Sequence, residues 1–105
     1  MGTYAIINKE FKFLENEYGF EISMKQKRGS YYYINYINKV VNIKVLYDEL
    51  SKEPLTIFVY DVDSLGFDAV EYKNEFEQKN INPRDIIRCA AMWLKRAIAD
   101  NTIII

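Results

Sequence analysis

The spacing of apolar residues changes at Gly19 from a helical period of about 3.6 to a strand period of two. Thr3 is a candidate N-cap for the helix that precedes this point, and Gly19 stands where helices commonly end in a left-handed residue. From Phe20 onward, apolar and polar residues alternate, which predicts a strand with one buried face made by Phe20, Ile22 and Met24. The apolar stripe of the predicted helix consists of Ile7, Phe11, Leu14 and Tyr18.

Four stretches have the alternation, or the β-branched and aromatic content, of strands. They are residues 20–25, 31–37, 40–47 and 55–62. Because the connections are short, with a tight reversal at Asn38-Lys39, we expect an antiparallel meander. The last stretch is apolar on both faces, which is typical of a strand that is central in the sheet or covered on both sides.

The last clear element is a helix that begins after Asn82, with Pro83 at its first position and Asp85 in its first turn. Residues 63–80 are interpreted as a loop and a short helix, and residues 103–105 as an edge strand or a docked tail. The sequence therefore predicts a single α+β domain over residues 1–105. It is a two-layer sandwich in which the N-terminal and C-terminal helices pack on an antiparallel sheet of four or five strands. The buried face of the last helix is predicted to contain Ile87, Ala90, Leu94, Ala97 and Ile98.

The composition is that of a globular protein, with 50% apolar and 28% charged residues. A single cysteine, Cys89, cannot form an internal disulfide bond, and we expect its thiol to be packed in the core. No signal peptide and no apolar run of about 20 residues is present, so we expect a cytoplasmic protein that does not interact with a membrane.

The sequence contains no histidine, which is the commonest general base and metal ligand. It also has no phosphate-binding glycine loop and no Cys-x-x-Cys pair. We therefore expect no enzymatic activity and no cofactor. One alternative stays open: Asp61, Asp63 and Asp68 follow a strand, and such carboxylates can hold Mg²⁺ in a metal-dependent phosphohydrolase.

A tyrosine-rich stretch, residues 31–37, allows a different alternative, because exposed rings beside basic residues can stack on single-stranded bases. Strand alternation sends Tyr31 and Tyr33 to one face, and Tyr32 and Tyr36 to the other. We therefore favour packing in the core or in an edge strand, and protein binding as the better functional alternative, because tyrosine is enriched at interfaces. A nucleic-acid-binding or self-associating structural domain remains the alternative, although a net charge of −1 does not favour nucleic acid as a partner.

Charge is segregated along the chain: residues 47–77 contain nine acids and two bases, whereas both flanking segments are net positive. The run FLENEYGF at residues 13–20, the tyrosine-rich strands after it and the late Pro-Arg-Asp helix with Trp93-Leu94 are also present. Together these features resemble small immunity proteins of bacterial polymorphic toxin and contact-dependent growth inhibition systems.

The resemblance implies a binding protein that neutralises a cognate toxin domain by occluding its active site or substrate groove. Many such toxins are nucleases with basic grooves, and an acidic surface would speed association with such a groove. Many inhibitors of nucleases are strongly acidic, whereas this chain has a net charge of −1. The charge therefore argues against a nuclease as the toxin more than it argues against a toxin-binding role. The predicted partner-binding residues are Asp61, Asp63, Asp68, Glu71 and Glu75.

Overall fold

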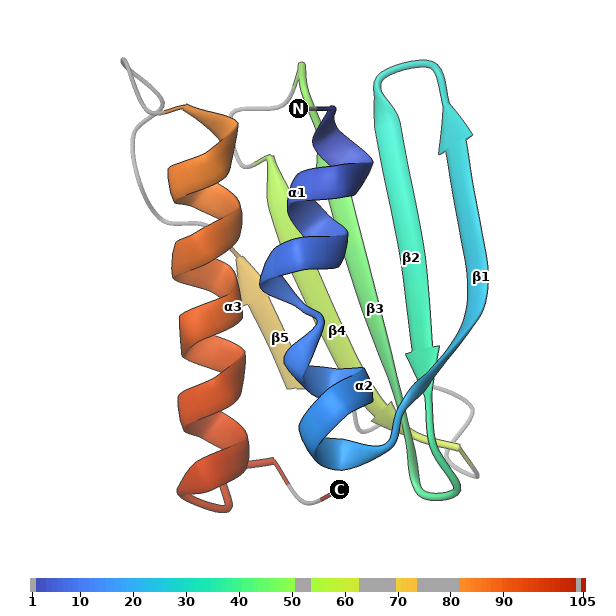
Figure 1. The fold of residues 1–105 in the computed structure, drawn as a ribbon, viewed down its shortest axis with the longest axis vertical. Helices are drawn as coiled ribbons and strands as arrows, with labels where there is room; N and C mark the ends of the chain where they lie inside the picture. Colours follow the sequence, from blue (N-terminus) through green and yellow to red (C-terminus); the bar gives the residue numbers. More distant parts are fainter. Residues whose placement is uncertain (1, 51–53, 63–69, 74–81, 104) are drawn as a thin grey trace.

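The computed structural model describes residues 2–50, 54–62, 70–73, 82–103 and 105, and the backbone alone for residues 70–73. Three helices lie in one layer against a five-stranded antiparallel sheet of order β1-β2-β3-β4-β5 (Figure 1). This confirms the predicted α+β sandwich. The elements are α1 (Thr3–Glu10), α2 (Phe13–Tyr18), β1 (Glu21–Arg28), β2 (Tyr31–Ile37), β3 (Val41–Asp48), β4 (Leu55–Asp61), β5 (Val70–Lys73) and α3 (Pro83–Ala99).

The N-terminal region contains two helices where the sequence predicts one. After Phe11 the hydrogen bonds tighten: the Leu14 amide donates to the Phe11 carbonyl at 3.1 Å, an i to i−3 bond. This tight turn separates α1 from α2 and still leaves Phe11 and Leu14 fully buried. Gly2, not Thr3, precedes the first helical residue, because the Thr3 hydroxyl donates instead to the Glu49 carboxylate at 3.2 Å.

Gly19 ends α2 as predicted, in the left-handed conformation with φ of 69°. The Phe20 amide donates back to the Leu14 carbonyl at 2.9 Å, and the Phe20 ring is buried. The chain thus turns directly from the helical layer into the sheet.

The predicted buried face of the first strand is wrong for Ile22 and Met24, because all eight residues of β1 are exposed. Ile22 is opposite the buried Tyr36 and therefore on the predicted face, but it is 38% exposed because β1 is at the edge of the sheet. A bulge explains the error at Met24, which is opposite Asn35. Neighbouring residues of β2 point to opposite faces, so the extra residue Ser23 turns Met24 away from the helices.

The other strand predictions are confirmed. Val41, Ile43, Val45 and Tyr47 are buried on one face of β3, and β4 is paired on both sides. The Asn38 side chain closes the β2–β3 reversal by accepting the backbone amides of Val40 and Val41, each at 2.7 Å.

A fifth strand forms, but not from the residues that the sequence suggests. Val70–Lys73, within the stretch interpreted as loop and short helix, pairs antiparallel with β4. Residues 63–69 and 74–81 of that stretch lie outside the described part of the chain. Neither Ile103 nor Ile105 belongs to a strand; Ile103 is buried and Ile105 packs against the core, as expected of a docked tail.

Helix α3 follows the prediction closely. The Asn82 side chain accepts the Asp85 amide at 2.9 Å, and Pro83 is the first helical residue. The five predicted apolar residues are buried, together with Ile86 and Ala91. Cys89 is the exception, because it is exposed rather than packed in the core. Within the described residues, no helix is both long and apolar enough to span a membrane.

Candidate functional site

The helices cover only one face of the sheet (Figure 1). Alternate residues of β2, β3 and β4 point to the other face, where the described part of the chain places no helix. We call this surface the open face. Most of its side chains are half-buried, whereas Tyr31 is 51% exposed and Asn35 is buried. The open face consists of Tyr31, Tyr33, Asn35, Ile37, Asn42, Lys44, Leu46, Asp48, Thr56, Phe58 and Tyr60.

Lys44 lies at the centre of the open face, on the middle strand of the sheet. Its ammonium nitrogen is 5.1 Å from the centroid of the Tyr60 ring and 6.0 Å from that of Tyr33. A side-chain hydrogen bond with Tyr60 is the main reason that the pKa of Lys44 is raised, against a smaller opposing effect of burial. The ammonium group is therefore charged at neutral pH and held between two rings.

Nothing in the described residues neutralises this charge. The ammonium group of Lys44 contacts the rings of Tyr33 and Tyr60, and no described carboxylate forms an ion pair with it. A half-buried cation surrounded by aromatic rings is suited to meet an acidic side chain of a partner.

Asn35 connects three strands beneath the same face. Its amide nitrogen donates to the Ser23 hydroxyl on β1 and, at 3.2 Å, to the Asn42 side chain on β3. The Ser23 hydroxyl in turn donates to the Asn35 carbonyl at 3.4 Å. These bonds hold the bulged part of β1 against the sheet, so the open face is a rigid surface.

Asp48 is the last residue of β3, opposite Tyr31 and beside the β1–β2 turn, and its carboxylate is already engaged. It accepts the Ser30 hydroxyl at 2.7 Å and the Leu50 amide at 3.0 Å. The Ser30 hydrogen bond is the main cause that lowers the pKa of Asp48. Asp48 therefore fixes the turns at this end of the sheet and is not directed at Lys44.

The first strand forms an edge of the sheet and carries most of its exposed cations. Lys25, Lys27 and Arg28 lie within four consecutive residues of β1. The Lys25 ammonium is 4.8 Å from the Tyr4 ring centroid, and that of Lys27 is 5.1 Å from the Tyr32 ring centroid. These two lysines therefore lie on the helix side of the sheet, whereas Arg28, opposite Tyr31, lies on the other side.

The acidic residues predicted to bind a partner are only partly described. Asp61 is exposed at the end of β4, opposite Val41, and Glu71 lies in β5 opposite Phe58. Asp63, Asp68 and Glu75 fall outside the described residues. Partner binding by this set, and the metal-site alternative, both remain predictions. Among the residues with described positions, no three His, Cys, Asp or Glu side chains gather closely enough to hold a metal ion.

Lys44, Phe58 and Tyr60 were missed as candidate site residues. A signal for them exists in the sequence, because the buried residues of β3 and β4 alternate with them and place them on the opposite face. Phe58 and Tyr60 are aromatic, and aromatic residues are enriched where one protein binds another.

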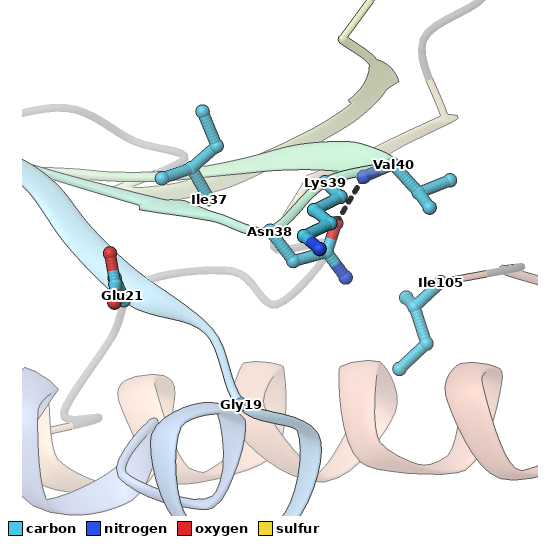
Figure 2. Close-up of a pocket in the computed structure, with 7 residues that line it drawn as sticks. All are labelled: Gly19, Glu21, Ile37, Asn38, Lys39, Val40 and Ile105. Atoms are coloured by element: carbon cyan, nitrogen blue, oxygen red, sulfur yellow. Dashed lines mark hydrogen bonds between the residues drawn. The ribbon is translucent and has the colours of Figure 1, made fainter.

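A hollow of about 570 Å³ opens at the end of the sheet near the chain terminus, between the turn after α2 and the β2–β3 reversal (Figure 2). Glu21 and Lys39 are the charged residues among those that line it. Figure 2 shows Ile105 below Val40, and both residues line this hollow. The lining is mostly apolar, and it lacks a buried polar side chain that would orient a small ligand. The hollow consists of Gly19, Glu21, Ile37, Asn38, Lys39, Val40 and Ile105.

Comparisons with known proteins identify no family. No protein-family model, no curated protein and no solved structure matches the chain. The function of the protein is therefore inferred from the open face and the free edge of the sheet.

Proposed function

We propose that this protein is a bacterial immunity protein: a cytoplasmic, non-catalytic binding protein that neutralises a cognate toxin domain by occluding its active site or substrate groove. The observation that carries the proposal is the open face, on which aromatic and apolar side chains surround Lys44, whose ammonium group has no ion pair among the described residues. Interfaces between proteins are enriched in such aromatic residues, and a few of them supply most of the binding energy.

Glu71, one of the acids predicted to bind a partner, is opposite Phe58 in the pairing of β5 with β4. A toxin seated on the open face would meet aromatic rings around the Lys44 ammonium group. The nine acids of residues 47–77 favour a basic substrate groove, such as that of a nuclease, as the occluded surface, and the Lys44 ammonium group would pair with an acidic side chain of the toxin.

Co-expression tests the proposal. The gene immediately upstream of the coding sequence is expected to encode a large secreted protein with a variable C-terminal domain. That domain and this protein should co-purify as a stoichiometric complex, and the complex should lack the toxicity of the free domain. A toxin domain that remains free and toxic in the presence of this protein would refute the proposal.

Variants of the open face locate the contact. Tyr33→Ala and Tyr60→Ala should each weaken the complex by more than about fivefold, as expected for truncated aromatic contacts worth about 1 kcal/mol or more. Met92→Ala is the matched control, because Met92 is an exposed apolar residue of α3. Equal losses from all three variants would show that binding does not use the open face.

Single-stranded nucleic acid is a second candidate ligand, because Tyr31, Tyr33 and Lys44 share the open face. Fluorescence anisotropy of a labelled dT15 oligonucleotide separates the two functions. Binding that weakens steeply with salt and is lost in Tyr33→Ala would support nucleic acid. Absence of binding at 50 μM protein, roughly the nonspecific affinity range, would leave the toxin domain as the partner.

A further inference from the structure

Strand β1 has one hydrogen-bonded neighbour in the described structure, β2, and no described element lies against its other edge, at the right of Figure 1. All eight of its residues are exposed, including Ile22 at 38% and Met24 at 50%. An edge strand presents a row of backbone donors and acceptors that can pair with a further strand. The free edge of β1 is therefore a surface distinct from the open face.

The geometry of β1 suits such pairing beyond the bulge. From Met24 to Arg28 the register with β2 is continuous, ending with Arg28 opposite Tyr31. Five regular residues follow the bulge, which is close to the usual length of a strand. A partner segment could therefore form a ladder of ordinary length along this edge.

The charges of the edge select the kind of partner. Lys25 and Lys27 point to one face of the ribbon and Arg28 to the other, and no described carboxylate forms an ion pair with any of the three. The rings of Tyr4 and Tyr32 hold the two ammonium groups in place without neutralising them. A strand with acids at alternate positions would meet both lysines from one face.

A second copy of this chain does not fit the same edge. Antiparallel pairing of the regular stretches of two copies, residues 24–28, would place Lys25 of each copy opposite Lys27 of the other. Like charges placed opposite each other on neighbouring strands are destabilising. Lysines on an edge commonly prevent self-association for this reason, and they leave the edge open to an acidic segment.

We propose that the free edge of β1 binds an extended acidic segment of a partner protein, which adds a sixth strand to the sheet. The segment carries Asp or Glu at the two positions that face Lys25 and Lys27. Backbone hydrogen bonds hold it in place, and its carboxylates provide specificity. The site goes beyond the proposed toxin contact, because it requires neither the open face nor a toxin.

The test uses the ¹⁵N-labelled full chain and a capped nonapeptide of alternating Glu and Val. Addition of the peptide to millimolar concentration should shift the backbone amides of residues 21–28 and slow their hydrogen exchange. A nonapeptide of alternating Lys and Val is the control and should have no effect.

A second experiment tethers each peptide sequence through a twelve-residue Gly/Ser linker to Ile105, which lines the hollow of Figure 2 together with Glu21. The tether raises the effective concentration to the millimolar range.

Charge reversal supplies the residue-level test. Lys25→Glu combined with Lys27→Glu should weaken binding of the acidic peptide by at least about tenfold, since two attractive cross-strand pairs become repulsive. The matched control is Lys9→Glu with Lys95→Glu, which reverses two exposed lysines on helices. The inference is overturned if the tethered acidic strand gives no protection of β1, if the Lys peptide binds equally, or if the shifts map to the open face. None of these outcomes affects capture of a toxin domain, so the two proposals can fail separately.

Discussion

The ammonium nitrogen of Lys44 lies 5.1 Å from the centroid of the Tyr60 ring, across two neighbouring strands of the open face. Lys44 is opposite Phe58, so Tyr60 is its diagonal neighbour. The ring and the hydroxyl of Tyr60 both favour the charged form of the lysine. This contact gives the open face a fixed positive centre.

Replacement of the Tyr60 hydroxyl should lower the pKa of Lys44. The hydrogen bond with Tyr60 is the largest cause of the raised pKa, so Tyr60→Phe should bring the pKa back toward the ordinary lysine value. Titration of the lysine side-chain ¹³C resonances measures the change. Tyr33→Phe is the matched control and should produce a smaller decrease, because the Tyr33 hydrogen bond contributes least.

The same shift has a consequence for stability at high pH. A pKa that is raised in the folded state stabilises the fold fully below the unfolded pKa, and this contribution is lost as pH rises through the folded pKa. Lys44 should therefore stabilise the wild type relative to Tyr60→Phe at neutral pH and lose that advantage above about pH 10.5. Equal pKa values in wild type and Tyr60→Phe would contradict the assigned cause.

Substitution of Gly19 should destabilise the protein through backbone strain alone. Gly19 has φ of 69°, and an added Cβ would meet no atom within 4 Å. Gly19→Ala should therefore lower the free energy of unfolding by about 1–2 kcal/mol, the cost of a left-handed residue with a side chain. Urea denaturation measures it. Gly19→Asn is the control with a smaller expected loss, since asparagine tolerates this conformation better. A loss as large for Asn as for Ala would indicate a cause other than backbone conformation.

Cys89 should react in the folded protein. Its side chain is exposed on α3, so a thiol reagent such as Ellman's reagent needs no unfolding to reach it. We expect complete reaction without denaturant, at a rate within about one order of magnitude of the rate in urea. Cys89→Ser should abolish the reaction and change the free energy of unfolding by less than about 0.5 kcal/mol. Protection of the thiol until the protein unfolds would show that the α3 surface around Cys89 is covered.

The prediction that Cys89 is buried was wrong, because its position on the helix matters more than its residue type. The expectation of a buried thiol came from the general tendency of cysteine, whereas helix periodicity already places Cys89 about 200° from Ile87 around the helix axis. Ile87, Ala90 and Leu94 are buried as their spacing predicts. Periodicity outweighed residue type in this helix.

The strands show which features of the sheet the alternation of apolar residues predicts and which it does not. The alternation of β3 predicts its buried face correctly, because its pairing with β2 and β4 has no interruption. In β1 the same alternation fails at Ser23, because a bulge depends on the partner strand and leaves no mark in the local pattern. Val70–Lys73 is short and half-charged, and it becomes a strand only because β4 offers an edge. The open face was missed for a related reason: Phe58 and Tyr60 look like core residues in the sequence, whereas the described helices all lie against the other face of the sheet.

Neighbouring residues of β4 provide a direct test of this one-sided cover. Ile57 is fully buried under the helices, whereas Phe58 lies half-buried on the open face. Ile57→Ala should lower the free energy of unfolding by about 2–5 kcal/mol, and Phe58→Ala by less than half of the loss measured for Ile57→Ala, although phenylalanine loses more atoms. Urea denaturation of both variants measures the two losses under the same conditions. If Phe58→Ala costs as much as Ile57→Ala, the second face of the sheet is covered in solution and is not a free binding surface. If the expected order holds, Phe58→Ala remains folded, so a weaker complex with a toxin domain would report the loss of a contact on the open face.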